Sequence, residues 1–175
     1  MSLTIARLND GSAADGVALL DGIYEHSPWI AAAAMAARPF ADLAHLRRAL
    51  ADATHAGGRD AQLALLRAHP KLAGKAMVAG TLTAESADEH ARSGLTCCSP
   101  EELGRLHALN DAYDRRFGWP FILAVRGPTG LGLTREEIIA TFERRLGNSP
   151  DDEFEECLRN VHRIAALRLA DRFGG

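Results

Sequence analysis

The sequence predicts an all-α protein, a single-domain bundle of about seven or eight helices, and three observations lead to this prediction. Apolar residues recur every three or four positions along most of the chain, which is the period of an amphipathic helix. Strict alternation of apolar and polar residues, typical of a half-buried strand, is nearly absent. Several segments begin with residues that cap helices. No repeat, low-complexity tract or linker-like stretch divides the chain, so we expect one domain over residues 1–175.

Three helix starts in the second half of the chain are clearly marked. Each pairs a hydroxyl side chain that can cap a helix with a proline or a glutamate in the first turn. They are Ser99-Pro100-Glu101-Glu102, Thr134 with Glu137, and Ser149-Pro150. The third opens a long last helix whose apolar stripe includes Phe154, Val161 and Ala165.

Earlier segments also have helical period, at 13–24, 28–37, 42–53 and 59–69. A short helix is further expected to open near Thr83. The apolar run 119–125 differs from these, because it is too short for a helix of its own and is bounded by glycine on both sides. Its pattern fits either an extended segment or the start of a buried helix.

The composition excludes several classes of protein. The 175 residues suffice to bury a core, and 47% hydrophobic with 25% charged residues is not the composition of a disordered chain. A formal net charge of −3 offers no basic field to a phosphate backbone, so we expect no nucleic-acid partner. Apolar runs are far shorter than the roughly 20 residues of a membrane helix, and no signal-peptide pattern opens the chain, so we expect no membrane association.

Motifs for disulfides, nucleotides and metals are incomplete. Cys97, Cys98 and Cys157 are an odd number with two adjacent, which favours a reduced, cytoplasmic protein. The glycines between 127 and 132 lack G-x-G-x-x-G spacing, and Gly74-Lys75 lacks the other residues of a P-loop. The cysteines match no zinc spacing, and the seven histidines form no H-E-x-x-H motif. We therefore expect no metal ion and no cofactor.

Arg168 does not fit the face of the helix on which it lies. At about 100° per residue, its side chain points into the apolar stripe of the last helix. An unpaired buried guanidinium is costly, so Arg168 must reach solvent or find an anion. Two interpretations are open: an arginine at the edge of the stripe paired with a structural carboxylate, or an arginine that binds an anionic ligand through its planar fork.

His69 also lies on an apolar face, shortly after Leu65 and Leu66 and directly before Pro70. Proline disfavours helical geometry in the preceding residue, so we expect the helix to end there, with His69 at a bend. His69 is then either a core histidine with satisfied hydrogen bonds or an acid–base residue with a pKa near neutrality.

Ser86, Glu89 and His90 share one side of the short helix expected after Thr83. On their own they fit a solvated helix face. Together with His69 and Arg168, they would supply an acid, a base and a clamp for an anion.

Four motifs form an ordered series along the chain. They are His69-Pro70-Lys71-Leu72-Ala73-Gly74-Lys75, Ser86-Ala87-Asp88-Glu89, Arg116-Phe117-Gly118-Trp119-Pro120-Phe121-Ile122, and Ile164-Ala165-Ala166-Leu167-Arg168-Leu169. This series, with its interval of twenty residues from His69 to Glu89, resembles the OHCU decarboxylase family of urate degradation. The resemblance covers nearly the whole chain.

The resemblance implies an all-helical fold, commonly a homodimer, and the decarboxylation of 2-oxo-4-hydroxy-4-carboxy-5-ureidoimidazoline to (S)-allantoin without a cofactor. It implies that His69, Glu89 and Arg168 are the catalytic residues. We expect His69 to be the acid–base residue and Glu89 to fix its tautomer or hydrogen-bond the substrate. We expect Arg168 to anchor the anionic substrate or to stabilise developing negative charge. The substrate-binding residues that the resemblance implies are Pro70, Ser86, His90, Phe121, Ile122, Leu123, Ala124 and Val125.

The chain departs from the family pattern at three places. His90 stands where glutamine is usual, Trp119 stands where phenylalanine is common, and the loop 127–133 is longer than in some relatives. His90 leaves a second interpretation open, in which the chain is a non-catalytic helical module that binds a ureide or a urate-derived anion. A purely structural helical protein is a third interpretation, and it would not bring His69, Glu89 and Arg168 together.

Overall fold

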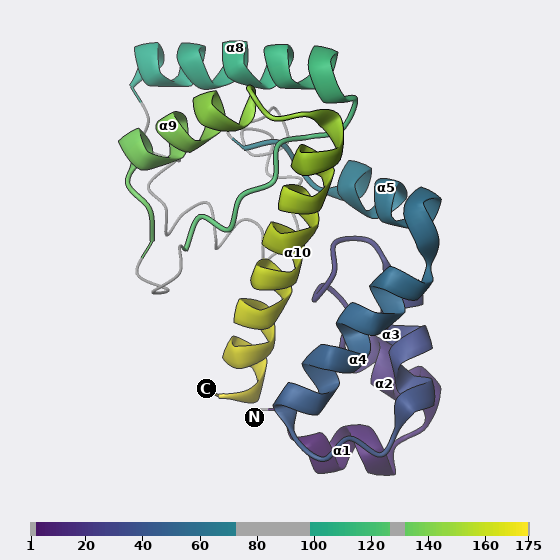
Figure 1. Ribbon diagram of the computed structural model, residues 1–175. Coiled ribbons are helices and arrows are strands. Elements are labelled where there is room, and N and C mark those ends of the chain that lie inside the picture. The colour runs from purple at the N-terminus through teal and green to yellow at the C-terminus, as the bar shows by residue number, and fades with distance from the viewer. Residues whose placement is uncertain (1–2, 73–98, 127–131, 175) are drawn as a thin grey trace. The chain divides into compact units, whose positions relative to one another are not determined.

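The computed structural model describes residues 3–72, 99–126 and 132–174, and within these ranges the chain folds into eight α-helices and one short 3₁₀ helix, with no strand (Figure 1). The all-α class predicted from the sequence is therefore confirmed. The elements are α1 (Ile5–Asp10), α2 (Ala13–Leu19), α3 (Pro28–Ala34), η1 (Met35–Ala37), α4 (Leu43–Ala56), α5 (Gly58–Ala68), α8 (Pro100–Phe117), α9 (Arg135–Arg145) and α10 (Pro150–Phe173).

The chain divides into two compact units, which are described separately below. The first unit comprises Met1–Ala68 and His162–Gly175, and the second comprises His69–Val161. Residues 162–173 of α10 thus belong to the first unit, and residues 150–161 belong to the second.

The first unit buries one apolar face of each of several capped helices. Thr4, Ser12 and Asp42 each accept a hydrogen bond from a main-chain N–H in the first turn of the helix that follows. The core side chains Leu8, Ile30 and Leu46 have no accessible surface. Burying a leucine or isoleucine completely contributes about 1.5–3 kcal/mol.

The end of α2 differs from the sequence prediction. A helix was expected over 13–24, but α2 ends at Leu19 and the chain turns through Gly22, which has a φ of 78°. A positive φ is easy for glycine and cannot continue a right-handed helix. The turn that results contains Glu25, which is buried.

The second unit is built from α8, α9 and the first half of α10, and its capped helix starts confirm the sequence prediction. Ser99 and Thr134 form capping boxes with the glutamates three residues later, and Ser149 accepts a hydrogen bond from the N–H of Asp152. The core is aromatic. The rings of Phe121 and Phe142 stack with their centroids 3.8 Å apart.

The apolar run 119–125 is neither helix nor strand, which decides between the two interpretations left by its pattern. Every residue in it is buried except Leu123, which is partly exposed. An irregular segment with a buried backbone must find hydrogen-bond partners outside regular secondary structure, because unpaired buried N–H and C=O groups are costly.

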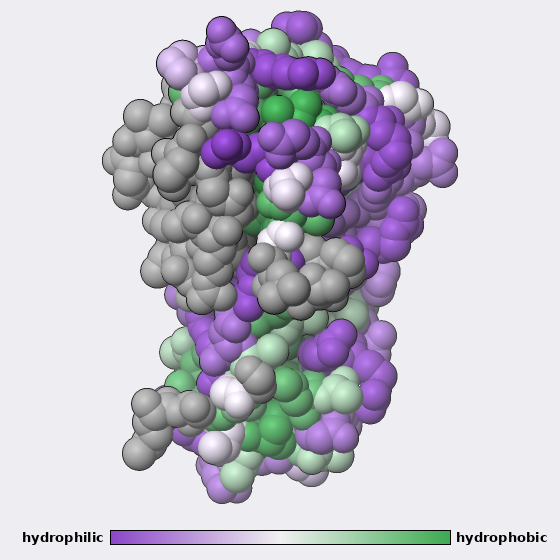
Figure 2. Space-filling model, turned by 90° about the vertical axis from the view of Figure 1, so that its left-hand side faces the viewer, coloured by the Kyte–Doolittle hydropathy of each residue, from purple (hydrophilic) through white to green (hydrophobic). Residues whose placement is uncertain are grey.

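The visible face in Figure 2 is mostly hydrophilic, with hydrophobic residues showing between the charged ones. Some exposed apolar surface is normal for a folded protein. In the described part of the chain, no helix combines the length and the apolar character that crossing a membrane requires.

Candidate active site

His69 lies directly after the end of α5, where the chain bends, and its side chain is buried. This confirms the prediction that Pro70 ends the helix. The chain after Pro70 is fixed to α8 within the second unit. The buried side chain of Asn110 donates a hydrogen bond to the carbonyl of Leu72 at 2.7 Å, and Lys71 forms an ion pair with Asp114. The bend that holds His69 is therefore anchored on its C-terminal side.

Arg168 is almost completely buried in the first unit, and its charge is compensated there. Its Nη1 atom donates to a carboxylate oxygen of Glu25 at 3.0 Å and to the carbonyl of Gly22 at 2.8 Å. Both charged side chains are at most 4% exposed. A carboxylate partner was one of the two interpretations of Arg168, although the structure places the pair in the interior rather than at the edge of the stripe.

That Arg168 also binds an anionic ligand stays a prediction. A guanidinium has five N–H donors in a rigid fork, and Glu25 and Gly22 both accept from Nη1. Glu25 was not foreseen, because it lies 143 positions from Arg168 and no local pattern links them.

Glu89, Ser86 and His90 lie outside the described residues. His69 and Arg168 are described, but they belong to different units. The predicted convergence of His69, Glu89 and Arg168 around one ligand therefore stays a prediction, and so does the substrate contact of Pro70, which is half-buried beside His69.

The segment Phe121–Val125 is held by side chains of α9 and α10. Arg145 donates from Nη1 to the carbonyl of Ile122 at 2.7 Å, and Asn160 accepts from the N–H of Ala124 at 3.0 Å. The carbonyl of Val125 accepts from the N–H of Leu133 at 2.8 Å. These bonds pair the carbonyls of Ile122 and Val125 and the N–H of Ala124, which regular secondary structure would otherwise satisfy.

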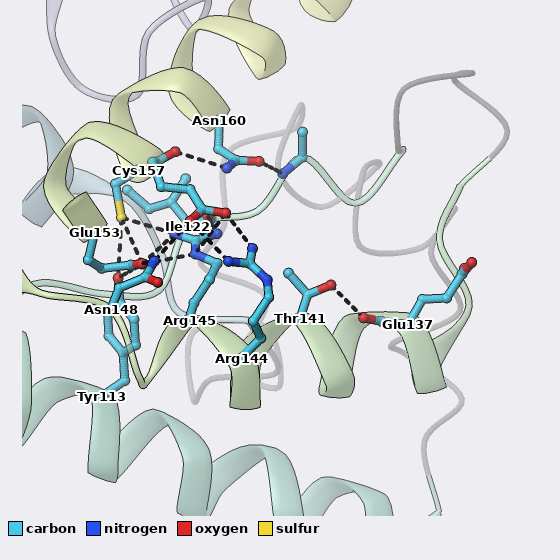
Figure 3. Close-up of polar contacts among 12 residues, drawn as sticks. Tyr113, Ile122, Glu137, Thr141, Arg144, Arg145, Asn148, Glu153, Cys157 and Asn160 are labelled. Atoms are coloured by element: carbon cyan, nitrogen blue, oxygen red, sulfur yellow. Dashed lines mark hydrogen bonds and ion pairs between the residues drawn. The ribbon is translucent and has the colours of Figure 1, made fainter.

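A fully buried ion pair, Arg145 with Glu153, lies next to this segment (Figure 3). Arg145 donates from Nε and Nη2 to one carboxylate oxygen of Glu153, at 2.9 and 2.6 Å, and neither side chain is exposed. Tyr113 donates to the same oxygen, and Asn148 donates to the other at 2.8 Å. Both oxygens of the buried carboxylate are therefore hydrogen-bonded, which is the condition under which a buried ion pair is tolerated.

Cys157 belongs to this network but does not have the surroundings of a reactive thiol. Its sulfur lies 3.2 Å from Arg145 Nη2 and 3.2 Å from Tyr113 Oη. Burial raises the pKa of the Cys157 thiol and outweighs the opposing effect of Arg145. Burial also raises the pKa of Tyr113. A protonated, buried thiol is a structural group rather than a nucleophile.

Arg145 was missed in the sequence, although a signal was present. It follows Ile138 by seven residues and so lies on the apolar face of its helix, as Arg168 does on α10. The misfit that drew attention to Arg168 also identifies Arg145.

The first unit contains a cavity of about 350 Å³ between α4 and α10, on whose wall Tyr24 and His162 meet. The hydroxyl of Tyr24 lies 2.8 Å from Nδ1 of His162. Burial, with a smaller contribution from His55, lowers the pKa of His162 to about 4, so this ring is neutral at pH 7. In the ranges that the structure describes, no three histidine, cysteine or carboxylate side chains are close enough together to hold a metal ion.

Residues 9–170 match the family model described as OHCU decarboxylase. The chain is similar to a 2-oxo-4-hydroxy-4-carboxy-5-ureidoimidazoline decarboxylase of Haloferax volcanii, with 39% identity over 97% of this chain and 94% of that protein. It is similar to the protein of that name from Mus musculus, with 37% identity over 98% of this chain and 94% of that protein. Among solved structures it is similar to an (S)-allantoin synthase, with a TM-score of 0.74 and 30% identity over 97% of this chain but 54% of that chain.

The lowered pKa of His162 predicts a loss of stability in acid. Between pH 6.5 and about 4 the unfolded chain binds a proton at this ring and the folded chain does not, so the free energy of unfolding falls as the pH falls through this window. His162→Gln cannot titrate, and we expect its urea denaturation midpoint to fall less than that of the wild type between pH 7 and 4.5. His107→Gln, at an exposed residue of α8, is the control for loss of a histidine. Parallel pH profiles for His162→Gln and the wild type would contradict the prediction.

Proposed function

The chain belongs to the OHCU decarboxylase family, and we propose that it is a carboxy-lyase that converts 2-oxo-4-hydroxy-4-carboxy-5-ureidoimidazoline to (S)-allantoin in urate degradation. The observation that carries this proposal is the similarity over nearly the full chain to proteins named for this decarboxylation. The resemblance to a solved (S)-allantoin synthase agrees in its product.

The chemistry of the substrate explains what the protein must do. The carboxylate leaves from a carbon beside a ring C=N, so the electron pair released with carbon dioxide moves onto the ring nitrogen. Since the substrate contains its own electron acceptor, the step requires no electron-accepting cofactor. The protein must position the substrate and stabilise the developing charge. It must also deliver one proton to one face of the ureido-bearing carbon of the former C=N bond, which sets the handedness of the allantoin, while the hydroxyl-bearing carbon that lost the carboxylate becomes a carbonyl.

Within this proposal His69 is the acid–base residue. A histidine can exchange a proton near neutral pH, and a fixed position matters because proton transfer requires a heavy-atom distance of about 3 Å. The bend at Pro70 and the anchoring of Leu72 by Asn110 supply such a fixed position. Glu89 would fix the tautomer of His69 or hydrogen-bond the substrate.

Arg168 anchors the anionic substrate in this proposal. Its carboxylate partner Glu25 and the carbonyl of Gly22 hold one edge of the guanidinium in place. A guanidinium that is already oriented loses less entropy on binding a second anion than a mobile one does. Pro70, Ser86, His90 and the segment Phe121–Val125 complete the proposed substrate-binding set.

The proposal extends to the assembly and place of action of the chain. The match over residues 9–170 includes most of both units, which supports their acting as one domain over residues 1–175. We expect a cytoplasmic homodimer that binds neither nucleic acid nor membranes. Light scattering is expected to give twice the mass of the chain, and the mass of a single chain would contradict the dimer.

Replacing His69 tests its role directly. His69→Asn removes the acid–base group, and we expect turnover to fall at least about 100-fold. The measurement follows the loss of fresh substrate above its spontaneous decay, together with the chirality of the allantoin, because spontaneous decay gives both enantiomers. His107→Asn is the matched control and should keep wild-type turnover. Near-normal formation of (S)-allantoin by His69→Asn would remove His69 from the mechanism, and racemic product from the wild type would favour a binding module.

Arg168 requires a variant that separates ligand binding from folding. Arg168→Lys keeps a positive charge near Glu25 but loses the planar fork, and we expect kcat/KM to fall about 10- to 100-fold, the effect of losing a charged hydrogen bond. Glu25→Gln keeps the guanidinium, so a smaller loss of kcat/KM is expected at a comparable loss of thermal stability. If Arg168→Lys lowers Tm while kcat/KM stays unchanged, Arg168 is only structural.

A further inference from the structure

Arg145 and Asn160, both labelled in Figure 3, hold the peptide units on either side of Leu123. Arg145 donates to the carbonyl of Ile122 at 2.7 Å, and Asn160 accepts from the N–H of Ala124 at 3.0 Å. The first bond engages the peptide unit between Ile122 and Leu123. The second engages the unit between Leu123 and Ala124.

Because a peptide unit is planar, these two contacts fix the directions of the N–H and the carbonyl of Leu123. Both peptide units are trans, since the one cis bond in the described ranges precedes Pro39. In a planar trans unit the N–H and the C=O point in opposite directions. With the carbonyl of Ile122 directed at Arg145, the N–H of Leu123 points away from Arg145. With the N–H of Ala124 directed at Asn160, the carbonyl of Leu123 points away from Asn160.

Within the described residues, the N–H and the carbonyl of Leu123 are among the main-chain groups of Phe121–Val125 that have no hydrogen-bond partner. Over residues 3–72, 99–126 and 132–174, no hydrogen bond involves its N–H or its carbonyl. Leu123 is the one partly exposed residue of the five in Phe121–Val125. The N–H of Leu123 thus points away from Arg145, and its carbonyl points away from Asn160.

The two holding side chains are themselves fixed. Arg145 is locked by Glu153 at 2.6 and 2.9 Å, and its guanidinium carbon lies 4.3 Å from the centre of the Phe121 ring. Asn160 donates from Nδ2 to the carbonyl of Glu156 at 2.9 Å, which fixes its amide so that Oδ1 faces Ala124. Neither side chain can turn away without leaving a buried polar group unpaired.

We propose that Arg145 and Asn160 are positioning residues that direct the N–H and the carbonyl of Leu123 toward an amide or ureido group of the substrate. This inference rests on the proposed function, in which Phe121–Val125 contacts the substrate. A ureido group carries a carbonyl that accepts from the Leu123 N–H and an N–H that donates to the Leu123 carbonyl. Neither side chain touches the ligand, and both act through the main chain between them.

The test compares two substitutions of Asn160. Asn160→Leu has a similar size but lacks the acceptor for Ala124, and we expect KM to rise at least about tenfold while kcat changes less. Asn160→Asp keeps an acceptor oxygen and should bring KM back to within about threefold of the wild type. A structural role alone would lower Tm in both variants without separating KM from kcat. Equal KM values for Asn160→Leu and the wild type would overturn the proposal.

Arg145→Lys provides a second test should Asn160→Leu fail to fold. Lysine keeps a charge for Glu153 but has no second donor arm for the carbonyl of Ile122, so KM is expected to rise in the same way. Arg144→Lys is the matched control, because the neighbouring Arg144 is exposed and pairs with Glu156, and its KM should stay within about twofold of the wild type. An unchanged KM in Arg145→Lys would contradict the proposal.

A direct readout separates this inference from the proposed function. The amide resonance of Leu123 is expected to shift when (S)-allantoin is added to the wild type, and to shift less in Asn160→Leu. A wild type without decarboxylase activity would refute the proposed function. An active wild type whose Leu123 resonance does not respond to allantoin would refute the positioning role alone.

Discussion

The second unit depends on one interaction, the fully buried ion pair of Arg145 and Glu153. A single carboxylate joins α9 through Arg145, α10 through Glu153 itself and α8 through Tyr113, while Arg145 also reaches the carbonyl of Ile122. Removing one partner of such a pair costs about 3–5 kcal/mol, because the other charge is left uncompensated. A hydrophobic pair of the same volume could match its stability but could not bind a carbonyl. The polar pair therefore has a geometric consequence, since it fixes the course of an irregular segment.

The first unit contains the same arrangement with different partners. Arg168 joins the carboxylate of Glu25 to the carbonyl of Gly22, and Arg172 donates to the carbonyl of Leu19 at 2.8 Å. Leu19 is the last residue of α2 and Gly22 lies in the turn after it, where a helix leaves its last carbonyls without internal partners. In both units an arginine inside an apolar face supplies the hydrogen bonds that an interrupted backbone lacks. A guanidinium suits this role because one planar group can bond a carboxylate and a carbonyl at once.

The sequence predicted what is decided locally and missed what is decided by tertiary contacts. The helix starts after Ser99, Thr134 and Ser149 were predicted because the cap and its partner lie within one turn. The bend at His69 was predicted because the following proline acts on its neighbour. The helix α1 was missed because six residues are too few to show a period, and the end of α2 was missed because it depends on Gly22 adopting a positive φ. The pairing of Arg168 with Glu25 spans 143 positions, so no pattern could reveal it.

The two buried arginine–carboxylate pairs and the backbone segments that they hold fit a decarboxylation in which the substrate itself takes up the electron pair released with carbon dioxide. An enzyme for such a step gains little from reactive groups of its own and depends on fixed donors and acceptors around the substrate, because preorganised dipoles need not reorient during the reaction. Main-chain groups suit this purpose, since a peptide unit held at one end has a defined direction at the other. The thiol of Cys157 and the hydroxyl of Tyr113 are reactive groups in principle, yet both lie buried in the Arg145–Glu153 network with raised pKa values. The network thus holds the backbone at Ile122 in place rather than offering a reactive group, which suits the role that we propose for the segment Phe121–Val125.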